Sequence, residues 1–372
     1  VNFTTSAQSQ LNNYTSLAYL SFAMPITHWW GASFGLVPYS SVGYQVSNQV
    51  NIDSVGPVNE QYKGSGGINR FYIGNSFMPV KHLSIGMNAS YMFGNITNER
   101  TAELNATSQT NYFSSDILNT TTISSLYFDF GLQYEWIIKS VRQRNKIAKN
   151  DTLHNKMQKY HKRILQDRVS VVFGFTFGPS TSLRATNTIL ATQYENSVGR
   201  YLIADTAQYQ TGVKTPVNIP LSIGYGITVK KGERWLVGAD YAYQNWSAFN
   251  SLGETGILSN STRASLGVQY VPNAMNDLPN TFFQHVQYRL GFRYSKTYLD
   301  LQNTQLNDYS VSAGFGFPIG PHRINSTFSM INIGIEIGQL GTTNNNLLQE
   351  NYYKLTIGFT FNDKWFIKPK FD

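Results

Sequence analysis

Hydrophobic and polar positions alternate along most of this chain, and residues 350–361 show the pattern most clearly. Tyr353, Leu355, Ile357, Phe359 and Phe361 fall on one face of an extended strand, and the residues between them are polar or small. Strict alternation over about ten residues is typical of a strand with an apolar environment on one side and a polar one on the other. A strand of about 9–11 residues is long enough to cross a membrane within a β-barrel. The pattern therefore predicts a membrane-spanning strand.

Twelve earlier segments repeat this alternation. They cover residues 16–24, 29–37, 68–78, 82–93, 125–137, 168–177, 219–229, 235–243, 263–271, 286–298, 309–317 and 328–337. We therefore expect an all-β fold, a transmembrane antiparallel β-barrel, that occupies residues 1–372 as a single domain. Thirteen strands are visible, whereas single-chain bacterial barrels have an even number. We expect about fourteen strands, the first of which is partly hidden in residues 1–13 or lies upstream.

The connections between the segments predict an orientation. Short turns, often marked by proline, alternate with long polar stretches at residues 38–65, 98–116, 185–215 and 250–262. Bacterial barrels have short periplasmic turns and long extracellular loops. Five of the six tryptophans lie near the short-turn side, where they would form an aromatic girdle at the membrane boundary. We therefore place the short turns, and a C-terminal tail at residues 362–372, in the periplasm.

Composition supports the barrel. Aromatic residues make up 14% of the chain and charged residues only 13%, well below the roughly 25% of a soluble domain. No run of ~20 apolar residues predicts a transmembrane helix. The alternative is a soluble β-sandwich with an aromatic core, which the low charge disfavours. Cysteine is absent, so the sequence predicts neither disulfides nor thiolate metal sites.

The face opposite the apolar one is rich in glycine and carries a few charges of both signs. Small side chains leave space in a barrel lumen for water, a ligand or a plug. Charges in a lumen usually pair with one another, which predicts an internal bracing network. The other interpretation is a ligand site, because paired guanidinium groups suit a carboxylate. The candidate ligand-binding residues are Arg289, Arg293, Arg263 and Asp240.

One connection on the short-turn side departs from the rule. Residues 139–168 are helical in composition and carry ten basic and two acidic residues, a charge of +8 that equals the charge of the whole chain. So concentrated a charge indicates a local contact, with anionic lipid or an acidic protein partner, or else a solvated helical hairpin. Nucleic acid is implausible in the periplasm. The candidate contact residues are Arg142, Arg144, Lys146, Lys149, Lys156, Lys159, Lys162 and Arg163.

Catalytic and metal-binding motifs do not stand out. The sequence has no nucleophile elbow, P-loop or zinc-binding helix motif. All six histidines fall near the short-turn side, where boundary residues are usually interfacial. We therefore expect no enzyme activity, no metal site and no cofactor.

Two stretches resemble a known family. The first is residues 29–44, WWGASFGLVPYSSVGY, and the second runs from YRLGF at 288–292 through NDY at 307–309, GFGFP at 314–318 and GTT at 341–343 to WFIK at 365–368. Together they resemble the FadL/TodX-type outer-membrane transport family, in a divergent branch. The resemblance implies a fourteen-stranded barrel with an N-terminal hatch, through which hydrophobic molecules enter from outside and leave sideways. The hatch and its Asn-Pro-Ala-like motif are not in this sequence, so no ligand residues can be transferred.

Two functions follow from these observations. The first is the passage of hydrophobic, fatty-acid-like small molecules across the bacterial outer membrane, which the resemblance and the small lumen residues favour. The second is a non-transporting barrel subunit of a larger outer-membrane machine, for barrel assembly or protein secretion, which the basic insertion favours. Outer-membrane lipid is a partner in both cases.

Overall fold

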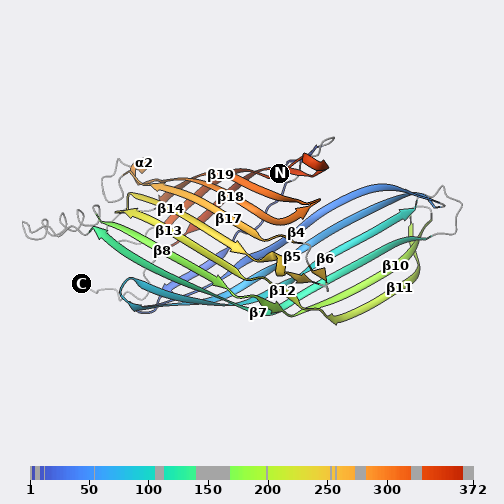
Figure 1. The fold of residues 1–372 in the computed structure, drawn as a ribbon, viewed down its shortest axis with the longest axis horizontal. Coiled ribbons are helices and arrows are strands. Elements are labelled where there is room, and N and C mark those ends of the chain that lie inside the picture. The colour runs from blue at the N-terminus through green and yellow to red at the C-terminus, as the bar shows by residue number, and fades with distance from the viewer. Residues whose placement is uncertain are drawn as a thin grey trace, which may run out of the picture.

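A curved antiparallel sheet forms almost the whole of the computed structural model (Figure 1). The structure describes residues 2–4, 9–11, 13–53, 55–104, 113–139, 168–197, 200–251, 254–255, 258–272, 282–319 and 329–362. Among these residues, helix is confined to α2 (Phe282–His285) and two single turns, η1 (Trp246–Ala248) and η2 (Asn344–Asn346). No helix within these ranges combines the length and the apolar character that a membrane crossing requires.

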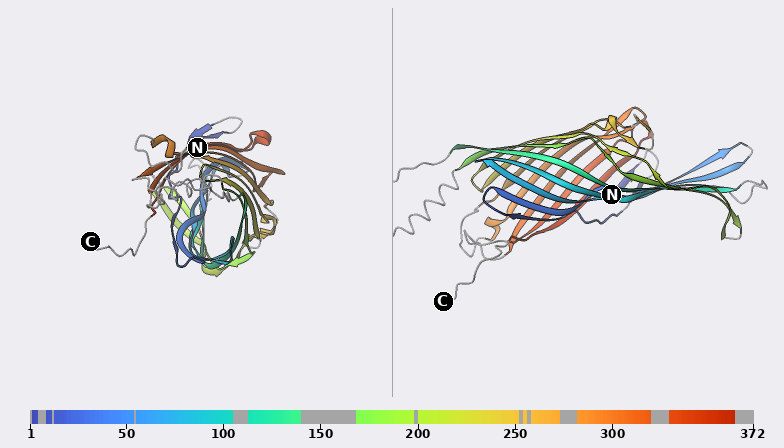
Figure 2. Two further views of the ribbon diagram at one scale, coloured as in Figure 1. Left: turned by 90° about the vertical axis from the view of Figure 1, so that its left-hand side faces the viewer. Right: turned by 90° about the horizontal axis from the view of Figure 1, so that it is seen from below.

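Thirteen strands form the barrel wall among the described residues, and each lies where the alternation predicts one. In the order of their pairing they are β3 (Leu20–Pro25), β4 (Trp30–Ile52), β5 (Gly56–Val80), β6 (Leu83–Leu104), β7 (Ser114–Lys139), β8 (Val169–Gly178), β13 (Ser222–Lys231), β14 (Trp235–Gln244), β17 (Ser261–Tyr270), β18 (Gln287–Leu301), β19 (Thr304–Ile319), β20 (Ser329–Gly341) and β21 (Gln349–Thr360). Seen along its long axis, the wall curves into a ring (Figure 2). The predicted fold class is confirmed.

The outward face of this wall is apolar and exposed. Leu126, Leu290 and Leu355 keep 59%, 66% and 65% of their surface accessible, although leucine is usually buried in a water-soluble protein. Their neighbours along each strand point the other way, because side chains alternate between the faces of a sheet. An exposed apolar belt opposite a polar interior is the arrangement of a barrel in lipid.

Aromatic rings gather at the short-turn end of the wall, as predicted. Trp29, Trp30 and Phe77 stack with ring centroids 6.0–6.3 Å apart, next to the β3–β4 and β5–β6 turns. Across the wall, the rings of Trp235 and Tyr270 lie 4.4 Å apart. Amphipathic rings prefer the boundary between lipid and water, so this end of the barrel has the character of a membrane girdle.

The N-terminal segment pairs with one edge of the wall. The short strand β1 (Asn2–Thr4) pairs antiparallel with the start of β21 and with β2 (Ser9–Leu11). Residues 1–13 therefore supply a short piece of strand in the position of the fourteenth, which was one of the two predicted possibilities. Over the rest of the seam, the free edges of β3 and β21 have no strand partner among the described residues.

Six strands continue past the barrel at the end opposite the short turns. They are the distal parts of β4, β5, β6 and β7, joined by the hairpin of β10 (Ala185–Ser197) and β11 (Arg200–Lys214), which pairs with β7 (Figures 1 and 2). We call this the projecting sheet. The sequence analysis treated residues 38–65, 98–116 and 185–215 as polar connections, and that was wrong. Their valine, threonine and tyrosine content favours strands, but without lipid to face they lack the apolar stripe that marks the other segments.

Close backbone contacts mark the junction between the barrel and the projecting sheet. Gly66 and Gly94 have φ angles of +108° and +146°, which side chains other than glycine rarely adopt. A Cβ atom on Gly94 would lie only 2.2 Å from the carbonyl oxygen of Gly67, and one on Gly66 equally close to that of Asn95. The strands bend here without losing register, because β5 and β6 stay paired through both glycines.

An apolar cluster packs against the wall at this junction. A second small sheet of β9 (Thr181–Leu183), β12 (Val217–Ile219), β15 (Asn250–Ser251) and β16 (Glu254–Thr255) brings Leu183 and Ile219 to the wall. The buried members of the cluster are Ile68, Met92, Ile123, Tyr127, Leu183, Ala185 and Ile219. Each fully buried large side chain contributes about 1.5–3 kcal/mol, so the cluster is a local core at the root of the projecting sheet.

The close backbone packing at the junction predicts the effect of adding a methyl group at Gly94. Gly94→Ala should lower the free energy of unfolding by about 2–3 kcal/mol, because the added Cβ overlaps a carbonyl oxygen and the backbone angle becomes strained. Tryptophan fluorescence during urea unfolding in detergent micelles measures this. Gly43→Ala is the matched control, since nothing lies within 4 Å of a Cβ there. Equal stability of the two variants would contradict the close packing described here.

Candidate functional site

The candidate site residues lie in the lumen, because the strands direct their polar side chains inward. Arg289 and Arg293 project into the lumen from β18, on the face opposite Leu290 and Phe292, which are 66% and 46% exposed on the outside. The two arginines are four positions apart, a rise of roughly 14 Å along the strand. They therefore occupy different levels of the lumen and have different neighbours.

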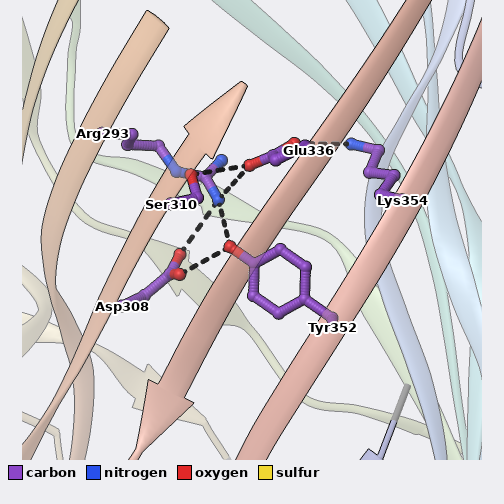
Figure 3. Close-up of polar contacts among 6 residues, drawn as sticks. All are labelled: Arg293, Asp308, Ser310, Glu336, Tyr352 and Lys354. Atoms are coloured by element: carbon purple, nitrogen blue, oxygen red, sulfur yellow. Dashed lines mark hydrogen bonds and ion pairs between the residues drawn. The ribbon is translucent and has the colours of Figure 1, made fainter. Parts of the chain in front are cut away.

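Arg293 lies in a network of ion pairs (Figure 3). Its Nη2 lies 2.7 Å from Glu336 Oε1 and 3.2 Å from Asp308 Oδ2. The same nitrogen donates a hydrogen bond of 2.7 Å to the hydroxyl of Tyr352. These contacts join β18 to the next three strands, since Asp308 lies on β19, Glu336 on β20 and Tyr352 on β21.

The remaining members close the network and balance its charge. Tyr352 donates to Asp308 at 2.8 Å, Ser310 donates to Glu336 at 2.8 Å, and Lys354 Nζ lies 3.8 Å from Glu336. Two cations therefore face two carboxylates. The side chains of Asp308 and Glu336 are each only 19% exposed, which strengthens the pairing relative to one in bulk water. Arg293 therefore links neighbouring strands in an internal bracing network, which was one of the two interpretations of the lumen charges.

Arg289 has a different environment. Its guanidinium donates to Gln269 Oε1 at 2.9 Å, to Asn332 Oδ1 at 2.8 Å and to the side-chain oxygen of Gln287. These acceptors are neutral amides, and Arg289 forms no ion pair within the described ranges. Gly316, which lies opposite Gln287 on β19, leaves room for the guanidinium, since a Cβ there would lie 3.3 Å from Arg289 Nη2. The positive charge of Arg289 is therefore held in the lumen without a matching carboxylate.

Arg263 and Asp240 complete the set of predicted lumen residues. They lie on the neighbouring strands β17 and β14, where Arg263 is opposite Ala242 and Asp240 opposite Ser265. Both side chains are exposed, and neither forms an ion pair in the part of the chain that the structure describes. The four candidate residues therefore do not form one site. Arg293 is held in its network of ion pairs, and no contact links the other three residues to one another in the described part of the lumen.

A second bracing network lies on β5, β6 and β7. Arg70 Nη1 lies 3.1 Å from Asp129 Oδ1, and Asn88 donates to Asp129 Oδ2 at 2.6 Å. The guanidinium of Arg70 also lies over the ring of Tyr72, 5.8 Å from its centroid. The sequence analysis did not identify Arg70 as a lumen residue. The parity of β5 could have found it, because Arg70 is in phase with the inward-facing Gly74.

Charged groups also meet at the short-turn mouth. Arg168 Nη2 lies 2.8 Å from Glu135 Oε1, and His82 Nδ1 lies 3.7 Å from Glu135 Oε2. Arg168 is the last residue of the predicted basic insertion. Residues 140–167 of that insertion, with the candidate contact residues between Arg142 and Arg163, lie outside the described residues.

A groove of about 700 Å³ lies at the junction with the projecting sheet. The N-terminal segment forms one side through Tyr14 and Leu17, and the wall forms the other through Leu36 and Phe93. The hydroxyls of Tyr14 and Ser41 lie 3.4 Å apart across it. Leu36 and Phe93 are in phase with the outward-facing residues of their strands, so the groove opens on the outside of the wall.

The contrast between the two arginines of β18 is testable. Arg293→Gln should cost about 2–4 kcal/mol of unfolding free energy, because it leaves two largely shielded carboxylates and Lys354 with unbalanced charge. Arg289→Gln should cost less than about 1 kcal/mol, since only neutral acceptors lose a donor. Urea unfolding in lipid vesicles measures both.

A double variant isolates the pairing. Arg293→Gln combined with Glu336→Gln should recover part of the cost of the single change, which gives a favourable coupling energy in a double-mutant cycle. Equal costs for the two arginine variants, or no coupling, would show that the network does not brace the wall.

Comparisons with known proteins found similar solved structures and one matching family model. The chain is similar to the Pseudomonas putida toluene transporter TodX (16% identity, TM-score 0.49, 92% of this chain and 81% of that one) and to the CymD monoaromatic hydrocarbon channel (13%, 0.48, 92% and 81%). It is also similar to a Pseudomonas aeruginosa FadL homologue (10%, 0.46, 91% and 74%). These are barrels of the type that the sequence resembles. No curated protein sequence matches. The BamG family model matches residues 1–165 and 139–372, and the chain therefore belongs to the BamG family.

Proposed function

We propose that this protein is a non-transporting barrel subunit of a larger machine in the bacterial outer membrane. The observation that carries the proposal is the projecting sheet, in which six strands extend past the barrel and present two open edges. Passage through a barrel needs no such sheet, whereas an assembly subunit needs surfaces to which other proteins bind. Membership of the BamG family fits a machine that assembles barrels.

The wall supports the same proposal. Strand pairing is continuous from β3 to β21, and two lumen networks tie neighbouring strands together through Arg70 and Arg293. These ion pairs resist a sideways exit between the strands that they join, although they do not cross the seam between β3 and β21. A braced wall suits a barrel that holds partners in place.

The basic insertion extends the proposal to the periplasmic side. The eight lysine and arginine residues between Arg142 and Arg163 would bind an acidic protein partner or anionic lipid headgroups there. The protein would then contact its assembly on both sides of the membrane.

The second candidate function is passage of hydrophobic small molecules. The groove beside Tyr14 and Leu17 favours it, since it is lined by apolar side chains at the level where the projecting sheet leaves the barrel. The glycine-rich lumen would leave space for a small ligand. Arg289 would then be the residue to meet an anionic group, because its charge has no carboxylate partner in the described part of the lumen.

The native mass of the gently solubilised protein tests the first proposal. We expect a particle much larger than the 41.9 kDa chain, with protein partners in fixed ratio. Neutralising the eight basic residues of the insertion to glutamine should lower the amount of co-purifying partner about tenfold, because several charge contacts are lost together. A control variant neutralises Lys81, Lys230 and Lys231, which lie in or beside other short turns at the same end of the barrel as the insertion.

The same preparation tests the second candidate. A lone barrel that carries a bound fatty acid or another apolar small molecule would overturn the subunit proposal and support passage. Depletion of the protein separates the two as well: loss of other barrel proteins from the outer membrane supports a subunit, and slower uptake of hydrophobic compounds alone supports a channel.

A further inference from the structure

The projecting sheet has two open edges, and they are built differently. One edge is β11, which pairs with β10 alone, and the other is the distal part of β4, which pairs with β5 alone. Each edge presents a row of backbone N–H and C=O groups, which forms a template on which another strand can pair. Natural sheets protect such edges with charges, prolines, bulges or short strands.

The β11 edge carries these protections. Its pairing with β10 shifts register at three places, and Gly212 adopts a positive φ of +70°. Asp205 and Lys214 place charges along it. Irregular, charged edges discourage further pairing, so β11 ends the sheet.

The β4 edge carries none of them over residues 42–52. These residues, VGYQVSNQVNI, include no charged residue and no proline. They pair with β5 in unbroken register from Val42 with Gly66 to Ile52 with Gly56. Strand β3 covers the β4 edge only as far as Leu36, and no other described strand pairs with it.

Side chains leave this edge open as well. The ring of Tyr44 leans inward over Gly64, and its hydroxyl donates to Asn98 Oδ1 on β6 at 3.2 Å. The largest side chain of the stretch therefore packs over the sheet and not over the edge. Val46 remains 55% exposed beside it.

The alternation along residues 42–52 determines which kind of strand could pair with the β4 edge. Val42, Tyr44 and Val46 line one face of the sheet, and Gln45 and Ser47 the other. A strand added here would continue both faces. Its side chains would be apolar on the face of Tyr44 and polar on the other, with few or no charges.

A second copy of this chain fits less well. Two copies inserted in the same direction in one membrane point their β4 strands the same way. Equivalent edges related by a two-fold axis along the membrane normal would then meet in parallel, whereas antiparallel pairing of identical edges requires an axis across the strands. The partner is therefore a different protein.

We propose that residues 42–52 of β4 form a strand-addition site, on which an extended, uncharged segment of another extracellular protein pairs as the next strand of the projecting sheet. The inference deepens the proposed function and rests on it, because an assembly supplies the protein that donates the strand. It would give the assembly a contact whose position is set by backbone hydrogen bonds.

Photo-crosslinking in intact cells tests the inference. A photo-reactive amino acid is placed at Gln45 or at Gln49 of the full chain, and the crosslinked residues are identified by mass spectrometry. We expect the probes at Gln45 and Gln49 to crosslink to one segment of one partner protein. The crosslinked residues should lie about four positions apart, because residues of paired strands lie opposite one another in sequence order. We call this pair of crosslinks a ladder. Matched probes at Gln208 and Gln210 on β11 should give no such ladder.

Two proline variants test the hydrogen bonding. Successive residues of a strand direct their N–H groups alternately to its two sides, so one of Ser47→Pro and Asn48→Pro removes a bond to β5 and the other removes only an edge donor. The variant that keeps wild-type unfolding stability should lower the crosslink yield about tenfold, which corresponds to ~1.4 kcal/mol. Unchanged yield in that variant would overturn the proposal.

The outcomes separate the inference from the proposed function. Partners that co-purify in fixed ratio without a ladder at Gln45 and Gln49 would overturn the strand-addition site and leave the subunit function standing. A ladder onto a second copy of this chain would also overturn it, since the donor would then be the chain itself. A native particle without partners would remove the proposed function, and the absence of crosslinks in cells would remove the inference.

Discussion

Backbone hydrogen bonding between strands is the constraint on which this structure depends. Lipid offers no partner to an N–H or C=O group, and each wall strand from β4 to β20 pairs its backbone with the strands on both of its sides. The pairing in turn fixes the register, and a slip of one residue would turn every apolar side chain of a strand into the lumen. The exposed leucines of the outer face and the arginines of the lumen are therefore two consequences of the same ladders.

The lumen shows how such a wall holds charge. Arg293 and Lys354 face Asp308 and Glu336, so the network is neutral and its members come from four strands. Arg70 and Asp129 repeat the solution on another part of the wall. Glycines beside these groups give long side chains room to lie flat across neighbouring strands. Arg289 differs from both, because among the described residues only neutral amides accept hydrogen bonds from its guanidinium.

Sequence reasoning recovered the wall well because lipid imposes a pattern on it. Thirteen strands were predicted from alternation, and each is present. The projecting sheet was missed because strands with water on both sides need no apolar stripe, so residues 42–52 read as polar loop although Val42, Tyr44 and Val46 alternate there. The different environments of Arg289 and Arg293 could not be predicted either. They depend on which residues of β17, β19 and β20 lie opposite, and register between strands distant in sequence leaves no local signal. Asp308 was missed for a simpler reason, since it lies one residue before the predicted start of its strand.

The glycines at the junction have a mechanical consequence. Because Gly66 and Gly94 let β5 and β6 bend while they stay paired, the projecting sheet is joined to the wall by uninterrupted hydrogen-bond ladders and not by a hinge. From Leu36 to the tip at Ile52, β4 extends roughly 50 Å. The projecting sheet is therefore a stiff extension of the barrel wall, and a force on its tip is transmitted directly to the barrel. The tip of the projecting sheet is kept at a fixed height and angle relative to the barrel, and a force that tilts the sheet would also twist the wall.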